Sequence, residues 1–333
     1  MPRRKLDFSL CNLMRGCACL RVSRLAAVVG AAVFTVGCVT TGIMAQQAGQ
    51  KTFSSPEEAS KAFMAAAKIN DEKALLEILG PDAKRIVSSG DETEDANNRA
   101  NIAKKYEEMH RFVREPDGTT TIYVGAENWP MPIPLERKGK VWYFDTAAGE
   151  KEILYRRIGR NELSTIRVCD ELVAAEKEYY AQHHEYAEKF VSDDGQHDGL
   201  YWKTSGNEPQ SPIGPLVASA VAEGYTKNPN GGATPYRGYF YRILLVQGSK
   251  ATGGAKNYVV NGKMTQGFAF LAYPAEYRAS GVMTFVVDQQ GIVYQKDLGT
   301  KTGELAKDMK QFNPDSTWQK TEEEENASAQ PKQ

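Results

Sequence analysis

Two of the four histidines lie side by side in the stretch EYYAQHHEYAEKF, Glu178–Phe190, and a third, His197, follows among aspartates. Histidine and carboxylate side chains are common zinc ligands. A helical zinc site needs its ligands on one face, whereas the adjacent His183 and His184 would point about 100° apart on an α-helix. The metal-ligand candidates are therefore His184, Asp194 and His197, and their spacing matches no established ligand pattern. The sequence favours an ordinary helix surface here and predicts no bound metal.

Other motifs supply no catalytic or cofactor-binding residue. Cys169 is a lone thiol on the apolar face of a predicted helix, where the role of a small buried residue is favoured over that of a nucleophile. The glycine-rich stretches NGGATPYRG and GSKATGGAKNYVVNGK lack the Gly-Lys-Ser/Thr ending of a phosphate-binding loop. No Gly-x-Ser-x-Gly nucleophile elbow occurs in the chain. We predict no catalytic residue and no cofactor, and the alternative is a metal-dependent hydrolase that uses the His183–Asp198 region.

Aromatic residues are concentrated in the second half of the chain. Most of them fit a core or a sheet face, while a subset could line a groove for a peptide or a glycan, because rings with polar tips suit binding surfaces. The residues concerned are Tyr201, Trp202, Tyr225, Tyr236, Tyr239, Phe240 and Tyr241. Both interpretations stay open, with core packing favoured.

The charge distribution argues against nucleic-acid binding. The 333-residue chain has a net charge of −1, but residues 1–45 carry six Lys/Arg and one acid, so the remainder carries −6. A mildly acidic body offers no electrostatic attraction for a phosphate backbone. The partners that we expect are an envelope protein, a peptide or a glycan.

The basic start precedes an uncharged apolar stretch, Leu25 to Met44, which is typical of an export signal. Three outcomes compete. Cleavage after Ala45 would give a mature start at Gln46, lipidation at Cys38 would use the lipobox-like sequence TVGC, and an uncleaved segment is just long enough to span a bilayer. We expect an exported protein in the periplasm or on the outer face of the envelope, attached to the membrane only if this segment is retained or lipidated.

The first half predicts an α+β domain over residues 52–158. Two helices are expected within 53–79, with Ser54 or Ser55 as an N-cap and a break at Asn70-Asp71. A polar loop followed by a third helix is expected within 90–112. Strands are expected over 118–128, 131–147 and 150–159, with a hairpin turn at Arg137–Lys140. Helices followed by a curved antiparallel sheet resemble the cone of nuclear-transport-factor-2-like domains, which often enclose a pocket.

The second half predicts another α+β domain over residues 160–318. A long helix is expected over 161–190, followed by the short helix 215–225 and strands within 239–248, 266–277 and 281–299, the last pair joined by a turn at Asp288–Gly291. A long helix followed by an antiparallel sheet resembles the heads of type IV pilins and pseudopilins. The polar tail, residues 319–333, is expected to be disordered.

Long segments of the chain resemble one bacterial family. SPEEASKAFMAAAKIND, YRRIGRNELSTIRVCDELVAAEKEYYA and FLAYPAEYRASGVMTFVVDQQGIVYQKDL are similar to domain-of-unknown-function family 2950, over roughly Phe53 to Trp318. The resemblance implies an exported bacterial protein and brings no activity and no functional residues. We therefore expect a non-catalytic binding or assembly module, and an apolar pocket with polar groups in the first domain would favour a small-ligand role.

Overall fold

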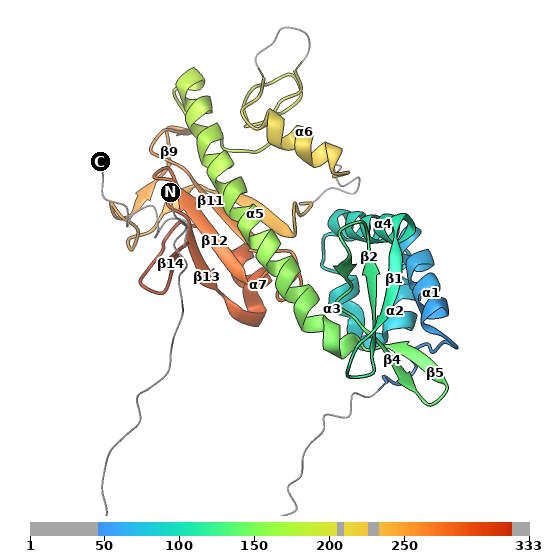
Figure 1. Ribbon diagram of the computed structural model, residues 1–333. Helices are drawn as coiled ribbons and strands as arrows, with labels where there is room; N and C mark the ends of the chain where they lie inside the picture. Colours follow the sequence, from blue (N-terminus) through green and yellow to red (C-terminus); the bar gives the residue numbers. More distant parts are fainter. Residues whose placement is uncertain (1–45, 205–209, 226–232, 322–333) are drawn as a thin grey trace, which may run out of the picture. The chain divides into compact units, whose positions relative to one another are not determined.

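The computed structural model describes residues 46–204, 210–225 and 233–321. It is a mixed α+β structure of helices and antiparallel sheets (Figure 1). This confirms the predicted α+β class. The expected export signal, with Cys38 and Ala45, lies outside the described residues. Within the described residues, no helix combines the length and the apolar character needed to cross a membrane.

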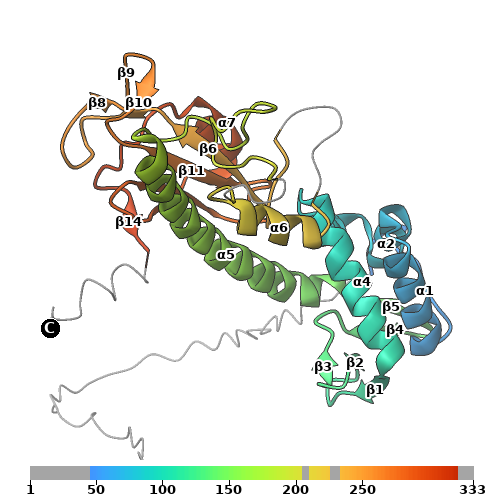
Figure 2. The ribbon, with the colours of Figure 1, turned by 90° about the horizontal axis from the view of Figure 1, so that it is seen from above.

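The first half begins with helices whose ends the sequence specifies locally. Ser55, Asp71 and Asp91 each accept a hydrogen bond from the backbone three residues on, as N-caps do. Helix α1 packs against both α2 and α4 (Figure 2). The elements are α1 (Pro56–Lys68), α2 (Glu72–Leu79), η1 (Pro81–Ala83), α3 (Lys84–Val87) and α4 (Glu92–Glu108). The predicted break at Asn70-Asp71 is confirmed.

An antiparallel sheet follows, with the order β1-β2-β4-β5 and with β3 paired to β2. Lys138 pairs with Val141, so Gly139 and Lys140 form the tip of the predicted hairpin, and Gly139 has φ +63°, a conformation that glycine adopts without strain. The strands are β1 (His110–Arg114), β2 (Thr120–Val124), β3 (Trp129–Pro130), β4 (Leu135–Lys138) and β5 (Val141–Phe144). A first hydrophobic core lies between this sheet and the helices.

Helix α5 (Thr146–His183) corrects two sequence predictions. The strand expected over 150–159 is wrong, because these residues form the start of α5. Leu154, Arg157 and Asn161 are buried at helical spacing, which holds this segment against its neighbours. The helix expected over 161–190 is also wrong at its end, because His184 has φ 57° and terminates α5. Tyr186 and Phe190 therefore lie beyond the helix.

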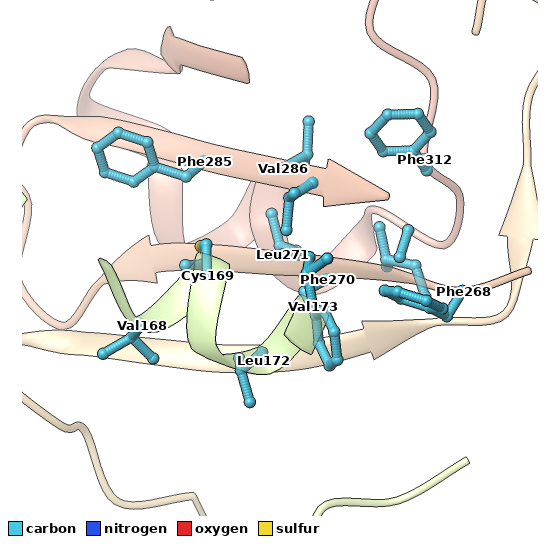
Figure 3. Close-up of a cluster of buried hydrophobic side chains, with 14 of the residues drawn as sticks. Val168, Cys169, Leu172, Val173, Phe268, Phe270, Leu271, Phe285, Val286 and Phe312 are labelled. Atoms are coloured by element: carbon cyan, nitrogen blue, oxygen red, sulfur yellow. The ribbon is translucent and has the colours of Figure 1, made fainter. Parts of the chain in front are cut away.

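The second half packs α5 against a five-stranded antiparallel sheet with the order β14-β13-β12-β11-β6. Figure 3 shows Cys169 and Val173 of α5 beside Phe270 and Leu271 of β11, within a second hydrophobic core. Gly291 N–H donates to Asp288 O at 2.9 Å, which confirms the predicted turn. The sheet strands are β6 (Tyr239–Leu244), β11 (Ala269–Pro274), β12 (Met283–Asp288), β13 (Tyr294–Asp297) and β14 (Gln319–Lys320).

Smaller elements complete the second half. They are α6 (Gly214–Ala222), β7 (Val246–Gln247), β8 (Lys256–Asn257), β9 (Val259–Val260), β10 (Lys263–Met264), η2 (Gly299–Lys301) and α7 (Thr302–Asp308). Strand β14 corrects the expected tail at its start, because Gln319 and Lys320 pair with β13. Thr321 is also bonded, because its N–H donates to Val293 O at 3.1 Å. Residues 322–333 of the expected tail lie outside the described residues.

The two hydrophobic cores draw on different parts of the sequence. The first core and its packed neighbours come from residues up to Ile153, and the second begins at Ile166. The predicted domain boundary near Arg160 falls between these positions, inside α5. A fragment of residues 160–321 is expected to unfold cooperatively in urea, because it contains the second core complete.

This fragment carries its own control. Leu172 is 2% exposed in the second core, so Leu172→Ala in the same fragment should lower the free energy of unfolding by about 3 kcal/mol. A fragment without a cooperative transition, or one insensitive to Leu172→Ala, would show that the two halves need each other to fold.

Candidate functional site

The histidines of the QHHEY stretch are engaged with aromatic rings. His183 stacks on Tyr179 with ring centroids 4.2 Å apart, and His184 meets Tyr180 edge-on at 6.4 Å. Helix α5 ends at His183, and His184 is its left-handed C-cap. These contacts are the packing of a helix terminus.

The remaining metal candidates lie in the loop after α5. His197 stacks on Trp202 with centroids 4.4 Å apart. Lys189 Nζ lies 2.6 Å from Asp193 and 2.7 Å from Asp198. No group of three or more His, Cys, Asp or Glu side chains suited to a metal ion occurs in the part of the chain that the structure describes. His184, Asp194 and His197 are thus not brought together as a ligand cluster there.

Cys169 and the aromatic residues of the second half belong largely to the core. Cys169 is fully buried, and burial raises the pKa of its thiol, which disfavours the reactive thiolate. Tyr239 and Trp202 are buried, and the other rings pack against the same core or, for Tyr225, beside it. Tyr225 donates its hydroxyl hydrogen to Asp91 Oδ2 at 2.8 Å. These positions leave no row of exposed rings among the seven residues for a peptide or a glycan.

A pocket of about 410 Å³ lies in the first half, between α4 and the first turns of α5. Its apolar lining comes from separate elements: Phe63 of α1, Leu79 of α2, Ile86 of α3, Ile102 of α4 and Ile153 of α5. Trp129 and Met131 close it from the side of β3. A partly enclosed apolar cavity of this size accommodates a small organic molecule.

The polar lining of this pocket is strongly basic. It consists of five cations and one acid, Asp95, together with the amides of Asn98 and Asn101. The cations are Arg99, Lys105, Arg156, Arg157 and Arg160. Among the described residues that line it, no Ser, Thr, Cys, His or Tyr is present. Of the residue types that serve as nucleophiles or general bases, the described lining holds Asp95 and Lys105. Its apolar side chains and cations are suited to binding a small molecule.

Two of the arginines are held by neutral oxygens. Arg157 is 9% exposed, and it donates to Arg85 O at 2.8 Å and to Ile86 O, which are carbonyls of α3. Arg99 donates to Val87 O and to Asn70 Oδ1. These bonds orient both guanidinium groups without neutralising their charge. Burial lowers the pKa of Arg157, which reflects the cost of holding this cation away from water.

The other three cations have carboxylate partners at the rim. Arg160 Nη2 lies 2.6 Å from Glu94, Lys105 Nζ lies 2.9 Å from Glu127, and Arg156 Nε lies 2.6 Å from Glu152. Arg156 also lies over the ring of Trp129, 5.6 Å from its centroid. Each rim cation is thus matched by one glutamate.

Asp95 is the acid nearest to the buried arginine. Its Oδ2 accepts a hydrogen bond from Ser89 N at 2.7 Å, and its Oδ1 lies 3.9 Å from Arg157 Nη2. Burial raises the pKa of Asp95, against the opposing effects of the Ser89 hydrogen bond and Arg157. At 3.9 Å the pair attracts without a direct hydrogen bond, so Asp95 offsets the positive charge of the pocket only in part.

The sequence contains a signal for this site, a basic run that the sequence analysis assigned to a predicted strand. Arg156, Arg157 and Arg160 form the basic run RRIGR. On the strand predicted over 150–159, Arg156 and Arg157 would have pointed to opposite faces, with Arg160 beyond its end. On α5, Arg157 donates instead to carbonyls of α3, and Arg160 pairs with Glu94 of α4. Arg156 lies over the ring of Trp129 in β3. Arg99 lies in a polar helix, and no feature of the surrounding sequence marks it as a pocket residue.

The fold and the pocket define a mixed α+β protein with a basic-rimmed apolar cavity. Residues 50–321 match the model of a protein family described as "Protein of unknown function (DUF2950)", and the chain belongs to that family. No curated protein and no solved structure shows a significant match to the chain.

Proposed function

We propose that this protein is a non-catalytic binding module that holds a small, largely apolar molecule in the pocket between α4 and α5. The observation that carries the proposal is the cavity of about 410 Å³, whose apolar lining comes from five separate elements. Folded proteins fill their interiors closely, so a cavity of this size is an expected binding site.

The proposal places the protein outside the cytoplasmic membrane of a bacterium, in the periplasm or on the outer face of the envelope. Support comes from the basic start of the chain and the uncharged stretch after it. Cleavage after Ala45, lipidation at Cys38 and retention as an anchor remain the three alternatives. An envelope protein, a peptide or a glycan would then be a second partner of the same module.

The finer architecture is part of the same proposal. Helices packed on an antiparallel sheet, with a partly enclosed pocket, support a cone-like first domain over residues 52–158. A long helix against an antiparallel sheet supports a pilin-head-like arrangement over residues 160–318. The hydrolase alternative in the His183–Asp198 region has no described observation in its favour, and metal analysis of protein purified without chelator tests it.

Filling the pocket is the direct test of the proposed function. Ile102 lines the pocket from α4, so Ile102→Trp is expected to occupy the space that a ligand needs. The probe is N-phenyl-1-naphthylamine, an uncharged apolar molecule that fluoresces when it leaves water. We expect saturable binding at one site in the wild-type protein and at least a tenfold loss of affinity in Ile102→Trp.

A matched control separates pocket filling from the addition of an indole. Ile69 is 72% exposed at the end of α1 and lies outside the pocket, so Ile69→Trp should bind the probe as the wild-type protein does. Equal thermal melting of the three proteins would exclude unfolding as the cause. Unchanged probe binding by a folded Ile102→Trp variant would contradict the proposal.

A further inference from the structure

The positive charges around the pocket outnumber the negative ones, and this excess indicates which kind of ligand the pocket binds. The three rim cations are each matched by a glutamate within 2.9 Å. The inner pair, Arg99 and Arg157, has one acid between them, Asp95, whose nearest approach to Arg157 is 3.9 Å. Counted with Asp95 ionised, the lining retains one uncompensated positive charge.

This positive charge lies where solvent is partly excluded. Arg157 is buried and Arg99 half-buried, and apolar side chains of α1, α2 and α3 line the same pocket. An unpaired charge in such surroundings is costly to the folded protein, and an incoming anion would relieve that cost. The attraction between opposite charges is also several times stronger there than at an exposed surface.

The two guanidinium groups are also fixed in orientation. The carbonyls of Arg85 and Ile86 hold Arg157, and Val87 O and Asn70 hold Arg99. A guanidinium has five N–H donors, and the contacts found in the described part of the chain occupy two on each. The other donors are free to bind an anionic group, and because the side chains are already ordered, binding costs little conformational entropy.

We infer that the ligand of this pocket is an organic monoanion with an apolar body, whose anionic group binds at Arg99 and Arg157 and whose body lies against Phe63, Ile102 and Ile153. The inference rests on the proposed function, because it names the class of ligand for the same pocket. It accounts for two features together, the apolar lining and the single unmatched charge.

The test compares two molecules of the same shape that differ in charge. Binding of 2-naphthoate and of its uncharged amide, 2-naphthamide, is measured by calorimetry with the full chain. Arg99→Met removes one guanidinium and keeps an unbranched side chain. Arg157 is left unchanged, because its bonds to α3 support the fold. The control is Arg137→Met, since Arg137 is exposed on the β4–β5 hairpin and lies outside the pocket.

We expect the wild-type protein to bind naphthoate at least about tenfold more tightly than naphthamide, the equivalent of one charge-assisted hydrogen bond. Arg99→Met should abolish this preference while naphthamide affinity stays within about twofold, and Arg137→Met should keep it. Higher salt should weaken the binding of naphthoate alone.

The outcomes that overturn the inference are distinct from those that overturn the proposed function. Equal affinity for the two molecules would overturn the anionic class. A preference that survives in Arg99→Met would overturn the placement of the anionic group at Arg99. Either result leaves the pocket as a binding site. Absence of binding by either molecule, together with absence of N-phenyl-1-naphthylamine binding, would overturn both.

Discussion

Glu176→Gln is expected to raise the free energy of unfolding, relative to the wild-type protein, by about 4 kcal/mol more at alkaline pH than at acidic pH. Glu176 lies on α5 in the second core and is completely buried. Its Oε2 accepts a hydrogen bond from Ala187 N at 2.9 Å, while Oε1 has no hydrogen-bond partner among the described atoms. Burial raises the pKa of this carboxyl to about 8, and the hydrogen bond from Ala187 opposes the rise only in part.

The sign of the pH dependence follows from this raised pKa. Between the ordinary pKa of a glutamate, 4.5, and the folded-state value of about 8, the folded protein keeps a proton that the unfolded chain releases. The free energy of unfolding therefore falls as pH rises through this window and levels off above it. Glutamine has the same shape and cannot ionise, so the contribution of position 176 to the slope disappears.

Urea denaturation of both proteins at pH 4.5, 6, 7.5 and 9 measures this effect. The difference between the variants at each pH is the useful quantity, because any cost of an unpaired amide in Glu176→Gln is the same at every pH. Glu178 is exposed on the same helix, so Glu178→Gln should leave the dependence of the free energy of unfolding on pH unchanged. Parallel curves for Glu176→Gln and wild type would mean that Glu176 is solvated in solution.

The second large effect concerns Asp91, which is 1% exposed. Its Oδ1 accepts from Glu94 N at 3.0 Å as the N-cap of α4, and its Oδ2 accepts from Tyr225 Oη and Gly238 N, both at 2.8 Å. Asp91→Ala removes the cap and leaves two buried donors without an acceptor. We expect a loss of about 4 kcal/mol, roughly 1 from the cap and the rest from the donors.

Asp71 offers a matched control for this measurement. It caps α2 in the same manner, accepting from Ala74 N at 2.9 Å. Asp71→Ala should therefore cost about 1 kcal/mol, the value of a cap alone. If urea denaturation gave equal losses for the two variants, the bonds from Tyr225 and Gly238 to Asp91 would contribute nothing to stability.

Several elements could be predicted because the signals that define them are local. Ser55 is the N-cap of α1, and Asp71, in the break after α1, is the N-cap of α2. Such caps are local because the unpaired N–H groups of a helix terminus are satisfied within three residues. The β4–β5 hairpin follows from a glycine at a position with positive φ. The family resemblance was also visible in the sequence, and the match over residues 50–321 confirms it.

The error at residues 150–159 shows where local signals end. Ile153, Leu154, Tyr155 and Ile158 suit a strand as well as a helix, because short apolar runs do not distinguish the two. Contacts with residues that are distant in the sequence favour a helix here. A Cβ at Gly149 would lie 2.5 Å from Pro132 O, so the first turns of α5 approach the β3–β4 connection more closely than any other residue at this position would allow. That approach also brings Ile153 and Arg157 to the pocket.

The sequence alone therefore determined the α+β class, the helix caps, the hairpin, the family, and the expectation that no motif of catalysis is present. Only the tertiary structure decided where α5 begins and ends, and only it assembled the pocket. The physical reason is that the pocket depends on contacts between distant residues: the guanidinium of Arg157 is oriented by the carbonyls of Arg85 and Ile86. Backbone carbonyls are the same in every residue, so no residue type marks them in advance as the acceptors of a buried cation.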